Sequence, residues 1–112
     1  MGGEILDYHA ALERLGGDEE FLAELLEEML SQLDEGIGEL KEAVDQADYE
    51  RLKRTAHGLK GASANLNIDG LAALFKQLEE MAAEQNLSDA NEAIDKIQDG
   101  KEQLRQFVDS LN

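Results

Sequence analysis

The chain has 112 residues with no Cys and no Pro, a length that fits one small domain over residues 1–112 without disulfide bridges. Hydrophobic residues make up 42% of the sequence and aromatic residues only 4%, which favours helices packed through aliphatic side chains. The 26 acidic and 10 basic residues give a formal net charge of -16, which argues against nucleic acid or an anionic membrane surface as a partner.

The shortest of five amphipathic stretches covers residues 5–15. Its apolar residues recur at helical spacing from Ile5 onward, Asp7 is the expected N-cap, and Gly16 and Gly17 end the helix. A helix this short is not stable alone, so we expect it to lie on another element.

The second stretch covers residues 18–46 and is the longest. Asp18 is its expected N-cap, and its apolar residues keep one helical phase throughout. Gly36 and Gly38 lie inside it and each cost about 1 kcal/mol relative to Ala, so we expect a bend or local softening there. The phase predicts one helix or two nearly coaxial ones.

Three further stretches have the same amphipathic character, over residues 48–66, 69–85 and 88–111. Asp48 and Asp69 are the expected N-caps of the first two, Asn67 is expected in the left-handed conformation between them, and Ser88 or Asp89 starts the third. Helices joined by such short turns bury their apolar stripes by packing as neighbours. We therefore predict an all-α fold, an up-and-down antiparallel four-helix bundle with the short N-terminal helix capping one open end.

Residues 51–65 differ from the rest of this acidic sequence. Four of the ten basic residues lie there, and no acidic residue does: Arg51, Lys53, Arg54 and Lys60. Gly58 and Gly61 also lie in this segment, inside a predicted helix where glycine is unfavourable, and they follow His57, one of only two histidines. The segment is therefore the candidate functional site.

A helical wheel indicates where His57 points. With Leu52 at zero on the buried side, His57 falls at roughly 140°, Gly61 at roughly 180° and Ala64 at roughly 120°. His57 is thus expected to face solvent beside a patch of helix without large side chains. Lys60 lies three residues further on, so its ammonium can reach a group attached to the imidazole.

An exposed neutral imidazole is a nucleophile at cellular pH, and a nearby ammonium offsets the charge of a transferring phosphoryl group. Phosphorylation of the ring is the reaction that this pair favours. The sequence contains neither a GxxxxGK[ST] loop nor a GxGxxG motif, so the phosphoryl donor is expected to be another protein.

The motif AHGLKGASANL at residues 56–66 resembles the signature of histidine-containing phosphotransfer (Hpt) domains. The resemblance extends to the five-helix layout and to the LGGDEE run at residues 15–20, and so to essentially the whole chain. Asn67 stands where the family commonly has Gly, and both residues tolerate the left-handed conformation.

The resemblance implies a relay in two-component signalling. His57 would accept a phosphoryl group on Nε2 from a receiver-domain aspartyl phosphate and pass it to another receiver. Lys60 would stabilise the phosphoryl charge, and Glu79, which follows His57 by 22 positions, would orient the imidazole through Nδ1. The residues expected at the docking surface are Gly58, Gly61, Ala64, Lys53 and Arg54.

The same resemblance implies a phosphotransfer intermediate without its own ATP site. No cofactor or metal is predicted on the chain, because the Mg²⁺ would be held by the partner receiver domain. His9 has no second candidate ligand nearby in the sequence and is interpreted as a surface or structural residue. The expected partners are receiver domains of response regulators or a hybrid sensor histidine kinase.

The N-terminus has no basic segment followed by an apolar one, and no stretch reaches 18 apolar residues. We therefore expect a cytoplasmic monomer that does not associate with membranes. An alternative function stays open, in which the bundle binds a partner without being phosphorylated.

Overall fold

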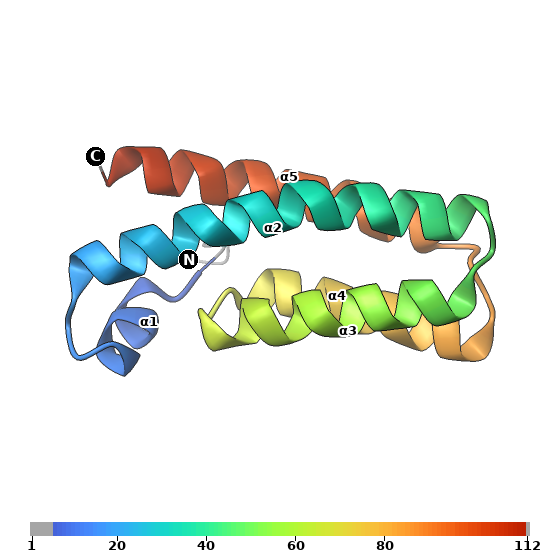
Figure 1. The fold of residues 1–112 in the computed structure, drawn as a ribbon, viewed down its shortest axis with the longest axis horizontal. Helices are drawn as coiled ribbons and strands as arrows, with labels where there is room; N and C mark the ends of the chain where they lie inside the picture. Colours follow the sequence, from blue (N-terminus) through green and yellow to red (C-terminus); the bar gives the residue numbers. More distant parts are fainter. Residues whose placement is uncertain (1–5, 112) are drawn as a thin grey trace.

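The structure is a computed structural model that describes residues 6–111. These residues form five α-helices and no strand, as predicted for an all-α fold (Figure 1). The helices are α1 (Tyr8–Arg14), α2 (Glu19–Asp45), α3 (Tyr49–Asn65), α4 (Asp69–Glu84) and α5 (Ala90–Ser110). Ile5, the first apolar residue of the predicted leader, lies outside the described residues.

Helices α2 to α5 run alternately up and down, and each packs against the next (Figure 1). Because α5 also packs against α2, the four helices close into a bundle. Helices α2 and α5 have 27 and 21 residues, whereas α3 and α4 have 17 and 16. The longer pair therefore extends past the shorter pair at one end, and α1 covers α2 there, as Figure 1 shows. The predicted capped four-helix bundle is confirmed.

Aspartate side chains begin the first three helices. Asp7, Asp18 and Asp48 each accept a hydrogen bond from the backbone N–H three residues further on, at 3.0 to 3.1 Å. These bonds satisfy N–H groups that have no partner inside the helix, so the three predicted N-caps are confirmed.

The predicted N-cap at Asp69 is wrong. Ile68 occupies the N-cap position of α4 and is fully buried, and no side chain caps this helix. The turn is closed by the backbone instead: Asn67 has a φ of 58°, as expected, and the N–H of Ile68 donates to the carbonyl of Ser63 at 2.9 Å. Burial of Ile68 thus sets the start of α4, and Asp69 lies in its first turn, where the helix dipole favours a negative charge.

The start of α5 lies at Asp89, one of the two residues predicted to begin this helix. Asp89 occupies the N-cap position, but its side chain accepts no cap hydrogen bond. The Oδ1 atom of Asn86 accepts from the backbone N–H of Ser88 at 3.1 Å, which shapes the turn before the helix. The helix therefore begins at Ala90, a fully buried residue.

Helix α1 is tied to the turn between α3 and α4. The backbone N–H of Asp7 donates to the carbonyl of Asn67 at 3.0 Å, and the Arg14 guanidinium donates to the carbonyl of Asn65 at 3.2 Å. Ala11 of α1 is buried in the same core as the bundle helices. These contacts explain how a seven-residue helix is kept in place.

The core is aliphatic, as the composition predicted. Phe75 is the one aromatic side chain that is fully buried among the described residues, and Ser63 is the one buried polar residue among them. Helix α2 runs unbroken through Gly36 and Gly38, so it is one helix rather than two coaxial ones.

Gly36 and Gly38 have different surroundings. Gly36 is buried under Leu59 of α3, and a Cβ atom at this position would lie 2.6 Å from Leu59 Cδ1. Gly38 is exposed, and a Cβ atom there would meet no atom within 4 Å. The first glycine thus permits close packing of α2 on α3, whereas nothing described in the chain requires the second.

The two glycines lead to opposite expectations for alanine substitution. Gly38→Ala is expected to raise the free energy of unfolding by about 0.5–1 kcal/mol, because alanine has the higher helix propensity. Gly36→Ala is expected to be less stable than Gly38→Ala by at least about 1 kcal/mol, because Leu59 must move. Urea denaturation measures both values. Equal stabilisation by the two substitutions would contradict the packing of Leu59 on Gly36.

Candidate functional site

His57 lies on the outer side of α3. Its side chain is 68% exposed, whereas Leu52, Ala56 and Leu59 of the same helix are buried against the bundle. The apolar stripe is held by the core, so the helix cannot turn His57 inward without exposing these residues. The imidazole is therefore open to a partner.

Helix α4 brings a carboxylate to the imidazole. Glu79 Oε2 lies 2.8 Å from His57 Nδ1, and the Glu79 side chain is only 16% exposed. A carboxylate in this position accepts a hydrogen bond from Nδ1–H, which favours the tautomer that leaves the Nε2 lone pair free. The residue that sequence resemblance singled out thus lies where it contacts the ring.

Lys60 also contacts Glu79. Its Nζ atom lies 2.7 Å from Glu79 Oε1, the second oxygen of the same carboxylate. The Lys60 ammonium, paired with the Glu79 carboxylate, holds the pKa of the Glu79 carboxyl below its usual value; burial opposes this effect and His57 adds to it. Glu79 is therefore ionised at neutral pH and can accept from both neighbours.

The pairing of Lys60 with Glu79 was not predicted. The sequence placed the Lys60 ammonium beside a group on the imidazole, whereas the structure shows it bound to the carboxylate that holds the ring. Single-helix geometry cannot reveal this pairing, because Glu79 comes from α4. One bridging carboxylate joins the imidazole and the ammonium into a three-residue cluster.

An open pocket lies beside His57 and Glu79. Its other lining residues come from α3 and are charged: Glu50, Lys53 and Arg54. Glu50 was not predicted to belong to the site, although it precedes His57 by seven residues and so lies on the same face of the helix. The pocket therefore carries charges of both signs.

The surface that follows His57 along α3 is bare. Gly58, Gly61 and Ala64 are all exposed, and a Cβ atom at either glycine would meet no atom within 4 Å. Packing within the described part of the chain therefore does not explain either glycine. These three residues leave room for another molecule to approach the helix backbone beside the imidazole.

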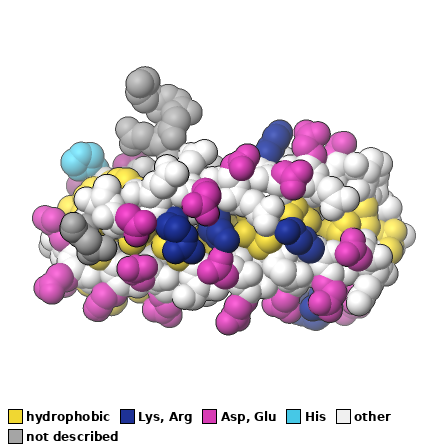
Figure 2. All heavy atoms as spheres, turned by 90° about the horizontal axis from the view of Figure 1, so that it is seen from above, with side chains coloured by type: hydrophobic (Ala, Val, Ile, Leu, Met, Phe, Trp, Pro, Cys, Tyr) yellow, Lys and Arg dark blue, Asp and Glu magenta, His cyan; other side chains and the backbone are white. Residues whose placement is uncertain are grey.

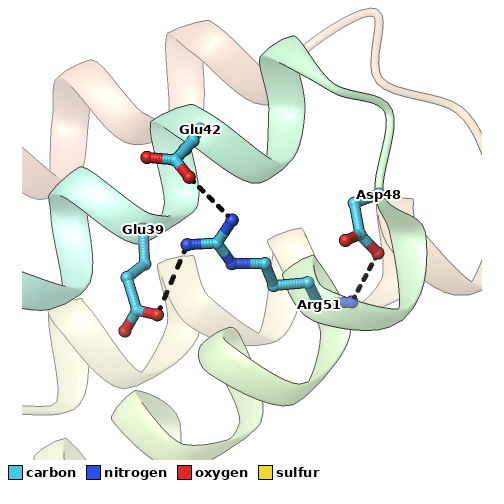
Figure 3. A network of polar contacts seen from close by, with 4 residues as sticks. All are labelled: Glu39, Glu42, Asp48 and Arg51. Atoms are coloured by element: carbon cyan, nitrogen blue, oxygen red, sulfur yellow. Dashed lines mark hydrogen bonds and ion pairs between the residues drawn. The ribbon is translucent and has the colours of Figure 1, made fainter.

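Arg51 does not contribute a free charge to this surface (Figure 3). Its guanidinium turns toward α2, where Nη1 lies 3.0 Å from Glu42 Oε1 and Nη2 lies 3.5 Å from Glu39 Oε1. Lys53 and Arg54 form no ion pair with any of residues 6–111. Two of the four basic residues of the segment thus remain available to a partner.

The face over α2 and α5 is rich in acidic side chains. Asp and Glu side chains are spread along the bundle there, with a few Lys and Arg side chains among them (Figure 2). Asp34 of α2 joins the two helices by accepting from Lys101 of α5 at 2.6 Å. This face therefore carries mostly negative charge.

His9 lies apart from this site. It is exposed on α1 and contacts the ring of Tyr8 edge-on, with the ring centroids 6.4 Å apart. Within residues 6–111, no three His, Asp or Glu side chains lie close enough together to hold a metal ion. No helix in that part of the chain is both long and apolar enough to span a membrane.

Comparisons with known proteins agree with this fold. The family model described as Hpt domain matches residues 24–109. The crystal structure of histidine-containing phosphotransfer protein B (HptB) from Pseudomonas aeruginosa PAO1 is similar, with 26% identity and a TM-score of 0.87 over 96% of this chain and 94% of that one. The HPT domain of a sensor hybrid histidine kinase from Shewanella shares the fold, with 21% identity and a TM-score of 0.78 over 96% and 92% of the two chains.

No curated protein gives a significant match to the chain. The family match nevertheless covers most of the sequence, including all of α3 and α4. Hpt domains carry phosphoryl groups and have no ATP site of their own, and they interact with receiver domains and histidine kinases. The chain therefore belongs to the Hpt domain family and has a phosphotransfer role in two-component signalling.

Proposed function

We propose that His57 accepts a phosphoryl group on Nε2 from the aspartyl phosphate of a receiver domain and passes it to the aspartate of another. The observation that carries this proposal is the 2.8 Å contact between His57 Nδ1 and Glu79 on an imidazole that is 68% exposed. The contact orients a ring whose other nitrogen is free to react.

The transfer begins with a neutral imidazole that carries its proton on Nδ1. The Nε2 lone pair attacks phosphorus, and the bond between phosphorus and the receiver's aspartate oxygen breaks, with its electron pair remaining on that oxygen. Glu79 accepts the hydrogen bond from Nδ1 throughout and stabilises the cationic ring that results. Lys60 contributes positive charge to the site through its contact with Glu79, the carboxylate that lies at the Nδ1 side of the ring.

Docking of the receiver uses the surface that borders His57. Gly58, Gly61 and Ala64 allow a close approach, while Lys53 and Arg54 attract an acidic, phosphate-bearing partner. We assign the Mg²⁺ of the reaction to the receiver and no residue of this chain as its ligand. The chain thus supplies the acceptor nitrogen and its orientation.

Substitution of His57 tests the acceptor directly. Wild-type protein incubated with a receiver domain carrying radioactive aspartyl phosphate is expected to take up acid-labile label, and His57→Gln is expected to take up none. The control variant is His9→Gln, which should label like wild type because His9 lies on α1, away from the site. Label retention after acid and alkali treatment identifies the phosphorylated residue type.

Two results of this labelling would contradict the proposal. If wild type takes up no label from any of a panel of phosphorylated receivers, the bundle is an interaction module that is not phosphorylated. If His57→Gln labels as well as wild type, another residue is the acceptor.

Substitution of Gly61 tests the docking surface. Gly61→Arg is expected to keep its fold, because the added side chain enters open space, and to slow transfer from a receiver by at least about tenfold. Labelling by phosphoramidate, a small donor that needs no docking, should be unchanged. Gly61→Ala is the graded control and should slow transfer less. Equal transfer rates for Gly61→Arg and wild type would contradict close approach at this glycine.

A further inference from the structure

The two oxygens of Glu79 have different partners. Oε2 contacts His57 Nδ1 at 2.8 Å, and Oε1 contacts the Lys60 ammonium at 2.7 Å. The Oε1 atom is itself buried and the Glu79 side chain is 16% exposed, whereas the side chains of His57 and Lys60 are 68% and 32% exposed, so the carboxylate is the shielded member of the cluster. A change of charge at Lys60 therefore alters the electrostatic environment of the imidazole through the carboxylate that lies between them.

The proposed function requires a phosphorylated His57 ring, and this inference rests on it. In that state, the proton on Nδ1 affects how readily the phosphoryl group leaves. A ring that carries phosphoryl on Nε2 and a proton on Nδ1 is a cation, and it departs from phosphorus as neutral imidazole. If the Nδ1 proton is lost, the ring has to depart as imidazolate, a far poorer leaving group. Proton occupancy of Nδ1 thus controls how readily the phosphoryl group leaves.

We propose that Glu79 and Lys60 together set the group-transfer potential of phosphorylated His57, by controlling how firmly Nδ1 holds its proton. The Glu79 carboxylate stabilises the cationic ring and retains the proton. Lys60 offsets part of the Glu79 charge and so limits this retention. Lys60 acts here as a positioning residue, through Glu79.

Other charges near the ring do not form an equivalent contact. From α4, Glu79 is the charged residue that lines the pocket beside His57; from α3, the pocket contains Glu50, Lys53 and Arg54. Those three residues are exposed, and none of them forms an ion pair with His57. Their effects are screened by solvent and salt, whereas the contacts of Glu79 are direct. The lowered pKa of the Glu79 carboxyl agrees with a carboxylate that stays charged throughout.

Transfer of the phosphoryl group from His57 to the receiver aspartate breaks one bond to phosphorus and forms another. The bond between phosphorus and Nε2 breaks, and its electron pair remains on Nε2. A carboxylate oxygen of the receiver aspartate forms the new bond to phosphorus. The proton stays on Nδ1 in its hydrogen bond to Glu79, so the ring returns to the tautomer that accepts the next phosphoryl group without exchanging a proton with solvent.

The experiment uses the full chain phosphorylated by phosphoramidate, with ¹⁵N-labelled histidine. NMR of the phosphorylated ring across a pH series gives the midpoint at which Nδ1 loses its proton, and ³¹P NMR gives the half-life of the phosphoryl group at each pH. The variants are Glu79→Gln and Lys60→Met. The matched controls are Glu80→Gln and Lys76→Met, which remove the same charges from exposed positions of α4.

The two variants are expected to shift in opposite directions. Glu79→Gln should lower the Nδ1 midpoint by about one pH unit or more and lengthen the half-life near the wild-type midpoint several-fold. Lys60→Met should raise the midpoint and shorten the half-life above it. The controls should stay at the wild-type values. A purely structural role would move both variants in the same direction and would change their circular dichroism.

Two outcomes would overturn the inference and can be told apart. If phosphorylated wild type and phosphorylated Glu79→Gln have the same Nδ1 midpoint and the same half-life, the inference is wrong and the proposed function is unaffected. If wild type gains no phosphoryl group on His57 from phosphoramidate or from any receiver, both the proposed function and the inference are wrong.

Discussion

The antiparallel packing of α3 against α4 is the constraint on which the rest of the site depends. Within the bundle, Leu52, Ala56 and Leu59 are buried on one side of α3, with Leu59 against Gly36 of α2, and His57 is exposed on the other side. The same packing brings Glu79 of α4 within 2.8 Å of the imidazole. The bundle core thus determines both the exposure of the imidazole and the carboxylate that contacts it.

Charge is divided between the scaffold and the site. The chain carries a net charge of -16, yet residues 51–65 contain no acidic residue. Arg51 is used within the bundle, where it joins α3 to Glu39 and Glu42 of α2. Lys60 is used within the site, where it pairs with Glu79. Lys53 and Arg54 form no ion pair within residues 6–111, and in the proposed function they attract an acidic partner.

Much of the fold could be predicted because it depends on local features. Helical periodicity predicted the five helices, and Asp7, Asp18 and Asp48 signalled three of their starts. The N-cap at Asp69 was predicted wrongly because the start of α4 is set by the burial of Ile68, a tertiary effect that side-chain chemistry does not reveal. Exposure of His57 followed from the wheel, whereas the pairing of Lys60 with Glu79 depends on how two helices meet and could not be read from either one.

The central claim is that His57 carries phosphoryl on Nε2 while Glu79 holds the proton on Nδ1. The most direct test is ³¹P and ¹⁵N NMR of the phosphorylated protein labelled with ¹⁵N at its two histidines, His9 and His57. We expect phosphorus coupled to Nε2 of His57, with a proton on Nδ1 of the same ring near neutral pH. Phosphorus coupled to Nδ1 of His57, or to either nitrogen of His9, would contradict it.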